Sequence, residues 1–209
     1  MRKIWMCVAM ALLLGSGAAF GGLFSEDPGE LAVSGALWLP GEGDSDLFDL
    51  GYGATVSYRE WFRFPWGVGL NLGIAQWQVD SGSSAYKWDQ LSNYNGDANL
   101  LLMGPALYFC VIDWDTWNLT LETGVQFAYI DSNVKVSLDN ERLNIDIDNA
   151  LFWHIGMEYE YMLAENFFIA GALGYQMDLI EAETEYSYGK LRDTHLHGPY
   201  FRLGAKLLF

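Results

Sequence analysis

Apolar and polar residues alternate along most of this chain with the two-residue period that is typical of β-strands. Alternating segments of roughly 9–14 residues are separated by turns that are short and long in succession. The pattern predicts eight strands, at 31–39, 48–60, 66–78, 98–112, 117–130, 149–162, 166–178 and 198–209. The long connections between them fall at 40–47, 79–97, 131–148 and 179–197. An even number of strands brings both ends of the sheet to the side of the short turns.

One face of every predicted strand lacks charged residues, in the segment 48–60 over positions 50–58. In the segment 117–130 this face consists of Leu119, Leu121, Thr123, Val125, Phe127 and Tyr129. A Lys or Arg on a lipid-facing position at mid-depth costs about 2–4 kcal/mol, so the absence of charge from all eight faces indicates contact with lipid. Aromatic residues also cluster at the strand ends, where a membrane meets water.

The opposite face of the strands carries small and polar residues. A soluble sandwich or lipocalin would invert this arrangement, and alternation alone does not distinguish the two. The charge-free face and the aromatic ends favour an all-β fold, an eight-stranded antiparallel up-and-down transmembrane β-barrel. Trp38 and Trp77 have the inward parity, which predicts either a bulge at these positions or a plug at the barrel mouth.

The first residues have the features of a secretory signal peptide. Arg2 and Lys3 precede an apolar run at 4–14, and small residues follow at 15–19. We therefore expect a signal peptide at 1–19, with cleavage as late as residue 21 as the alternative. Residues 20–30 would then form a short lead and 31–209 the barrel. A buried N-terminal helix is the less favoured interpretation, because the run has no polar residues at helical spacing.

Charge and cysteine content limit the partners of the chain. The formal net charge is −16, and it becomes more negative when Arg2 and Lys3 leave with the signal. Nucleic acid needs clustered Lys and Arg, so we expect no nucleic-acid partner. Cys110 would be the single cysteine of the mature chain, which predicts that no internal disulfide forms. No residue pattern indicates a cofactor.

The last ten residues alternate up to a terminal phenylalanine. The positions that carry this pattern are Tyr200, Phe201, Leu203, Ala205, Leu207 and Phe209. The ending resembles the C-terminal signal of bacterial outer-membrane proteins, which the barrel-assembly machinery reads. The mature chain as a whole resembles the OmpA/OmpX-type class of small eight-stranded barrels. This resemblance implies a location in the bacterial outer membrane, with its lipids and the assembly machinery as partners.

Several inward positions of the predicted strands carry charge. The set consists of Arg59, Glu122, Glu158, Glu160, Arg202 and Lys206. One interpretation is an ion or proton path, and the other is a neutralised plug. We favour the plug, because an eight-stranded barrel is just wide enough to be filled by its own side chains and buried charges must be paired. Pro105 lies in the middle of a strand, where we expect a bulge or a bridging group.

The long connections and the histidines offer further candidate sites. Acidic residues at Asp139, Glu141, Asp146 and Asp148 suggest weak binding of Ca²⁺ or Mg²⁺, which prefer hard oxygen ligands. Solvation of these residues without a ligand is the simpler alternative. His195 and Asp193 share a connection with Ser187, but no nucleophile motif surrounds that serine.

These features predict a non-enzymatic outer-membrane barrel that supports the membrane and binds an external ligand through its surface loops. An outer-membrane enzyme acting on lipid A or other envelope substrates is the alternative. A small-solute channel is the third possibility.

Deletion of Phe209 should reduce insertion into the outer membrane without affecting export across the inner membrane, because the terminal aromatic residue belongs to the resembled assembly signal. The amounts of the chain in outer-membrane and periplasmic fractions measure this. Deletion of Gly82, in the long connection at 79–97, serves as a control for loss of a residue outside that signal. Normal insertion of the chain that lacks Phe209 would contradict the interpretation of this ending.

Overall fold

The computed structural model describes residues 29–39, 48–79, 92–138, 141–182, 184–186, 189–190 and 196–209. The strands are β1 (Glu30–Trp38), β2 (Phe48–Arg63), β3 (Trp66–Val79), β4 (Ser92–Trp114), β5 (Trp117–Leu138), β6 (Glu141–Ile147), β7 (Ala150–Ala164), β8 (Phe167–Ile180), β9 (Thr184–Tyr186), β10 (Gly189–Lys190) and β11 (Gly198–Leu208). Over these ranges, no helix has the length and apolar character needed to cross a membrane.

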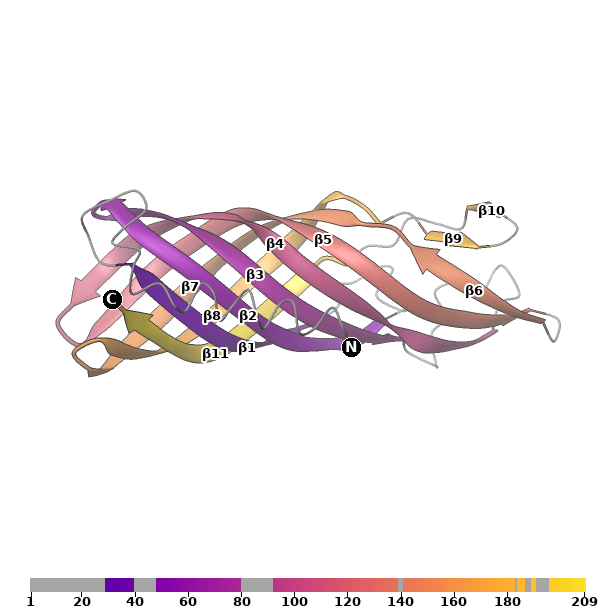
Figure 1. Cartoon of the computed structure of the whole chain (residues 1–209), viewed down its shortest axis with the longest axis horizontal. Helices are drawn as coiled ribbons and strands as arrows, with labels where there is room; N and C mark the ends of the chain where they lie inside the picture. The colour runs from indigo at the N-terminus through magenta and orange to yellow at the C-terminus, as the bar shows by residue number, and fades with distance from the viewer. Residues whose placement is uncertain are drawn as a thin grey trace.

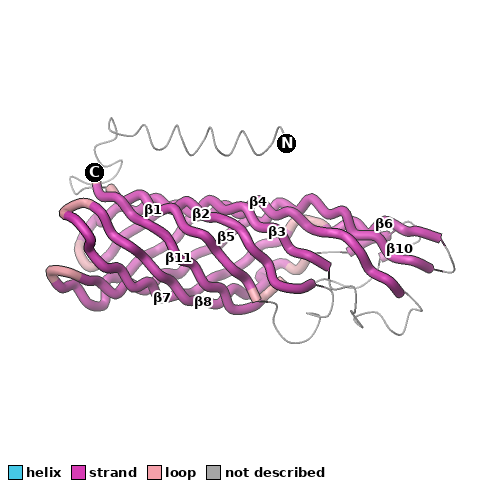
Figure 2. The backbone as a smooth tube through the Cα atoms, turned by 90° about the horizontal axis from the view of Figure 1, so that it is seen from below, coloured by secondary structure: helices cyan, strands magenta, loops and turns pink. Residues whose placement is uncertain are grey.

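Eight of these strands close into a ring, in which each pairs antiparallel with its neighbours in the order β1, β2, β3, β4, β5, β7, β8 and β11. The ring closes where β1 pairs with β11 over nine residue pairs, from Glu30 with Leu208 to Trp38 with Tyr200. Figures 1 and 2 show the resulting tilted strands around a common axis. The prediction of an eight-stranded up-and-down barrel is thus confirmed.

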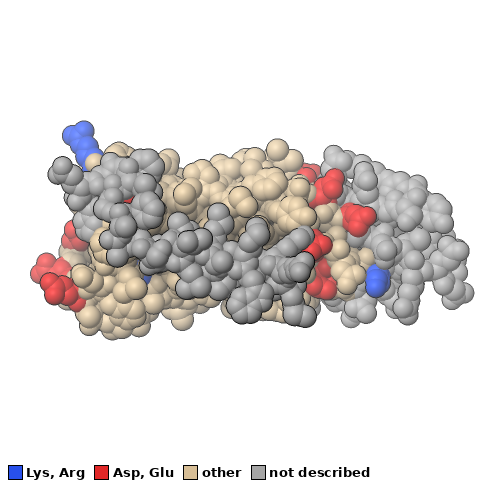
Figure 3. Space-filling view, in the orientation of Figure 1, with Lys and Arg blue, Asp and Glu red and all other residues tan. Residues whose placement is uncertain are grey.

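The charge-free strand faces point away from the barrel axis. Their exposed residues include Val33, Leu70, Leu107, Leu121, Met157, Leu173 and Leu203. On the side shown in Figure 3, charged side chains gather toward the two ends of the molecule, and the band between them is almost free of charge. Exposed aromatic residues border the band on the short-turn side, at Phe62, Phe64, Trp66, Trp114, Tyr161 and Phe209. This is the belt that a lipid bilayer covers.

The sheet continues well beyond the barrel on the side of the long connections. β4 and β5 extend past their predicted ends and pair with each other as far as Ser92 and Ser137. β6 pairs with the end of β5, β9 with β6, and β10 with β9. We call residues 92–97 and 131–138 together with β6, β9 and β10 the blade, which lies opposite the chain's C-terminal end in Figure 1.

The sequence-based expectation of loops at 131–148, at the end of 79–97 and over part of 179–197, which holds β9 and β10, was therefore wrong. It ended the strand at residue 130, where the apolar residues change from odd to even positions. Outside the lipid the outward positions are polar, at Asp131, Asn133 and Lys135, while Val134 on the other face is buried. Polar residues can continue a ladder there, as the pairing of Lys135 with Asn144 shows. Gly96 has φ = 141°, a backbone conformation that favours glycine, near the irregularity between the pairs at Ser92 and Asn95.

Pro105 does not produce the expected bulge in β4. The ladder with β5 pauses between Met103–Phe127 and Ala106–Gly124 and then resumes in the same register. On the other side, Pro105 stays opposite Leu70 without interruption. A proline lacks one backbone donor, and a local gap in one ladder accommodates that loss without an inserted residue.

The interior of the barrel is apolar toward the blade. Trp38 and Trp77 are 4% and 2% exposed, and they point inward among buried residues of the neighbouring strands. Phe48 packs edge-on against Trp77, with ring centroids 6.0 Å apart. No register shift occurs along β1, so Trp38 reaches the interior by regular alternation. A shift does occur between Phe48 and Gly51 of β2, beside the pair of Gly51 with Trp77. The two tryptophans thus fill the mouth of the barrel, which was one of the two predicted possibilities.

Candidate functional site: the charged interior layer

The half of the interior toward the short turns is polar. The structure brings together the six charged residues singled out from the sequence: Arg59 from β2, Glu122 from β5, Glu158 and Glu160 from β7, and Arg202 and Lys206 from β11. Regular alternation turns each of them toward the axis. The exposed fractions of Glu122, Glu160 and Lys206 are 2% or less. With their contacting neighbours, these residues form what we call the charged layer.

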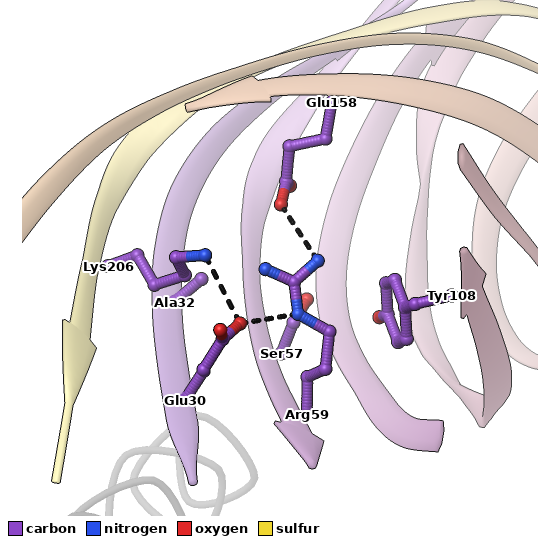
Figure 4. A pocket seen from close by; sticks show the side chains of 7 residues that line it. All are labelled: Glu30, Ala32, Ser57, Arg59, Tyr108, Glu158 and Lys206. Carbon is purple, nitrogen blue, oxygen red and sulfur yellow. Dashed lines mark hydrogen bonds and ion pairs between the residues drawn. The ribbon is translucent and has the colours of Figure 1, made fainter. Parts of the chain in front are cut away.

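Four residues of the charged layer form a closed quartet of ion pairs. Arg59 donates from Nε to Glu30 Oε2 at 2.5 Å and from Nη2 to Glu160 Oε1 at 2.5 Å. Lys206 Nζ contacts the same two carboxylates, lying 3.1 Å from Glu30 Oε2 and bonding Glu160 Oε2. Figure 4 shows Glu30 between Arg59 and Lys206. Each carboxylate therefore has two cationic partners, which compensates for the loss of water.

Glu30 is the member of the quartet that sequence reasoning missed. It was assigned to the lead segment at 20–30, one residue before the expected start of the first strand. Its side chain is only 7% exposed, and it also accepts a hydrogen bond from Trp61 Nε1 at 2.7 Å. The available signal was parity, because Glu30 shares the inward face with Ala32 and Ala36.

A second group of the charged layer is centred on Glu122. Arg202 Nη2 bonds Glu122 Oε2, and His154 Nε2 lies 3.0 Å from Glu122 Oε1. Asn71 Nδ2 donates to Glu122 Oε1 at 2.8 Å, and the Tyr108 hydroxyl donates to Asn71 Oδ1 at 3.1 Å. Because an ionised carboxylate only accepts hydrogen bonds, the hydrogen between His154 and Glu122 belongs to Nε2.

Glu158 lies between the quartet and the Glu122 group. Its Oε1 is 3.5 Å from Arg59 Nη1, and its Oε2 is 4.0 Å from Arg202 Nη2. It borders a small cavity with Glu30, Ala32, Ser57, Arg59, Tyr108 and Lys206, which Figure 4 shows from close by. The cavity has room for about one water molecule.

Aromatic rings pack against the cations of the charged layer. Arg59 Cζ lies 4.8 Å from the ring centroid of Tyr108, and Arg202 Cζ lies 5.3 Å from that of Tyr200. The Tyr200 ring fits because Gly156 and Gly174 lie beneath it, where a Cβ at either would come within 2.3 Å of the ring or its hydroxyl. These stacked rings occupy volume that water would need in order to cross the barrel.

The other candidate residues are only partly described. Asp139 lies outside the described residues, and Glu141 is placed by its backbone at the start of β6. Asp146 and Asp148 are exposed at the end of β6. Within the described ranges, no three His, Cys, Asp or Glu side chains are grouped as they would be around a metal ion.

The structure does not describe the residues considered for an enzyme. Ser187, Asp193 and His195 lie outside the described ranges. His197 Nδ1 is 3.4 Å from Asp178 Oδ2 near the apolar end of the interior.

The C-terminal residues that resemble an assembly signal lie on both faces of β11. Phe201, Leu203, Leu207 and Phe209 face outward, Ala205 is half-buried, and Tyr200 is buried inside. The backbone of Phe209 exchanges two hydrogen bonds with Gly29, at 3.1 Å and 3.0 Å. Recognition of these residues by an assembly machinery stays a prediction.

The fold is similar to those of several solved outer-membrane proteins. A major outer membrane protein from Thermus thermophilus aligns with a TM-score of 0.53 at 16% identity, over 87% of this chain and 99% of that one. Neisserial surface protein A aligns with a TM-score of 0.52 at 10% identity, over 88% and 98%. Outer membrane protein AlkL aligns with a TM-score of 0.50 at 10% identity, over 90% and 92%. No protein-family model and no curated protein sequence matches the chain.

The closed ring, the apolar belt and these similarities define the class of the protein. It is a small eight-stranded β-barrel of the bacterial outer membrane, as the sequence predicted. At these identities the similarity establishes the fold, and the role of this barrel has to be argued from its own residues.

Replacement of both Arg202 and Lys206 by Met should destabilise the barrel by about 3–5 kcal/mol or more, because it leaves buried carboxylates without cations. The denaturant dependence of unfolding in detergent measures this. Lys135→Met removes a cation from the exposed blade and should change stability by about 0–1 kcal/mol. An unchanged stability of the double variant would contradict a plug and favour a hydrated path.

Proposed function

We propose that this protein is a non-enzymatic outer-membrane barrel that supports the membrane and presents the blade outside the cell as a binding surface. The observation that carries the proposal is the length of the strands. A tilted strand needs about 9–11 residues to cross a bilayer. β4 and β5 have 23 and 22 residues, so about half of each is left to form structure outside the lipid.

The blade supports a binding role because it is a paired sheet rather than a set of short loops. Its described side chains are polar on the exposed positions, at Asp131, Asn133, Lys135, Asp146 and Asp148. Val134 and Ile147, by contrast, are buried, with exposed fractions of 1% and 4%. An ordered surface loses less entropy when a ligand binds than a loop that must first become ordered.

The interior supports a structural role rather than transport. The quartet, the Glu122 group and the two mouth tryptophans fill the described cross-section with side chains that pair or pack with one another. Ion pairs of this kind resist separation, because breaking one leaves an uncompensated buried charge. A small-solute channel would need these contacts to open.

The alternative of an enzyme on lipid A or other envelope substrates has weaker support. His197 and Asp178 form a pair that could orient a general base. Ser187, the serine considered as a nucleophile, lies outside the described residues.

The blade carboxylates are the part of the surface for which a ligand class can be named. Asp146 and Asp148 are exposed, and Asp139 and Glu141 belong to the same hairpin in the sequence. The outer leaflet bears phosphates, and divalent cations bridge carboxylates and phosphates through oxygen. We infer weak binding of Ca²⁺, with a dissociation constant on the order of 10⁻⁴–10⁻³ M, as in extracellular sites.

Calorimetric titration of the detergent-solubilised barrel with Ca²⁺ tests this proposal. The wild type should give binding heat, and Asp146→Asn with Asp148→Asn should abolish most of it. The matched control, Asp113→Asn with Asp115→Asn, changes exposed acids at the opposite end of the barrel and should leave the heat unchanged. Absence of heat, or equal loss in both pairs, would contradict cation binding by the blade.

A shortened chain tests whether the blade is a binding surface that the barrel does not need for its assembly. Replacing residues 135–144, which lie beyond the pair Val134–Ile145, by Asn-Gly should leave a barrel that still inserts into membranes. It should bind Ca²⁺ more weakly than the wild type, because it lacks Asp139 and Glu141 but keeps Asp146 and Asp148. Failure of this chain to insert would show that the blade serves assembly of the barrel, and would contradict its role as a separate binding surface.

A further inference from the structure

The charged layer contains one more carboxyl group than it has permanent cations. Its titratable groups within the described residues are Glu30 on β1, Arg59 on β2, Tyr108 and Cys110 on β4, Glu122 on β5, His154, Glu158 and Glu160 on β7, and Tyr200, Arg202 and Lys206 on β11. β3 and β8 contribute the neutral Asn71 and Phe168 at this level. Four carboxyl groups thus face two guanidinium groups and one ammonium group.

Three of the four carboxyl groups are closely paired with those cations. Glu30 and Glu160 share Arg59 and Lys206, and Glu122 bonds Arg202. The close pairs therefore use every permanent cation of the layer. Glu158 is left with distances of 3.5 Å and 4.0 Å to guanidinium groups that are already engaged. The hydrogen bond that it accepts from Arg59 Nη1 is long. An ionised carboxylate in such a place is costly, because two long contacts to shared cations replace only part of the water that it has lost.

His154 does not supply the missing positive charge in this arrangement. Its Nε2 hydrogen is used by Glu122, which Arg202 already neutralises. Its Nδ1 is buried and has no hydrogen-bond partner within the described residues. A second hydrogen on Nδ1 would therefore add a buried donor without an acceptor.

We propose that Glu158 is a proton-binding site, occupied in the folded barrel at neutral pH. The proton comes from water, binds one carboxyl oxygen of Glu158 and leaves that group neutral, so that three carboxylates balance three cations. The side chain of Glu158 is 13% exposed, whereas those of Glu30, Glu122 and Glu160 are 7%, 1% and 1% exposed. The cavity beside Glu158 in Figure 4 gives water a place from which to deliver the proton.

The infrared band of a protonated carboxyl group tests the site directly. The folded wild type in detergent at neutral pH should show this band, and Glu158→Gln should remove it. Glu165→Gln, an exposed acid at a short turn, is the matched control and should leave the band in place. Absence of the band from the wild type, or its persistence in Glu158→Gln, would overturn the proposal.

Stability against pH gives a second measurement. At neutral pH the folded chain would hold a proton that the unfolded chain has released, so stability should fall as the pH rises until Glu158 ionises in the folded state. The unfolding equilibrium constant should then change about tenfold per pH unit, the effect of one proton. Glu158→Gln should remove this dependence and be at least as stable as the wild type at neutral pH.

Glu160→Gln distinguishes a neutral Glu158 from a paired one, because it removes a carboxylate that has two close cations. It should raise the unfolding equilibrium constant at neutral pH, whereas Glu158→Gln should not. Equal destabilisation by the two substitutions, or failure of Glu158→Gln to fold, would show that Glu158 is ionised and paired, and would overturn the proposal.

Discussion

The pairing of β1 with β11 is the interaction on which the rest of the structure depends. In the hydrocarbon of a bilayer, every backbone N–H and C=O must find a partner within the protein, and a sheet can provide this only by closing on itself. The nine pairs from Glu30–Leu208 to Trp38–Tyr200 complete that closure. Closure separates an outer face, which meets lipid, from an inner face, and alternation along each strand assigns every side chain to one of the two.

Closure with eight strands also determines the nature of the interior. The space is narrow enough for side chains from opposite strands to meet, so Arg59 on β2 reaches Glu160 on β7, and Arg202 on β11 reaches Glu122 on β5. These contacts tie strands that share no backbone hydrogen bonds. The charged layer and the apolar cluster under the blade therefore act as internal cross-braces, and they fill the space through which a solute would pass.

Outside the lipid, strands no longer need to close into a ring or to keep an apolar outer face, and the sheet is open there. β4 and β5 continue as a pair beyond the belt, and β6, β9 and β10 attach to them as additional short strands rather than as members of the ring. The polar pairs of the blade, such as Lys135 with Asn144, would be costly inside the belt and are stable in water. The binding surface that we propose lies in this part of the sheet.

The features imposed by the lipid were predictable from the sequence, and those outside it were not. Alternation places Leu121 outside and Glu122 inside, and both lie there. Glu30 was missed because the first strand was started at the first apolar residue, although its inward parity was visible. The blade was missed because the apolar residues change from odd to even positions after Tyr129, where the outward face leaves the lipid and becomes polar. The partner of each interior charge could not be derived, because it depends on how the strands pair across the barrel.

The central claim is a closed barrel whose interior is filled by paired and packed side chains. Current through planar lipid bilayers tests it most directly, on protein whose insertion is shown by different gel migration of boiled and unboiled samples. The account predicts no steady conductance from inserted wild-type protein. Sustained porin-like currents from the same preparation would contradict it.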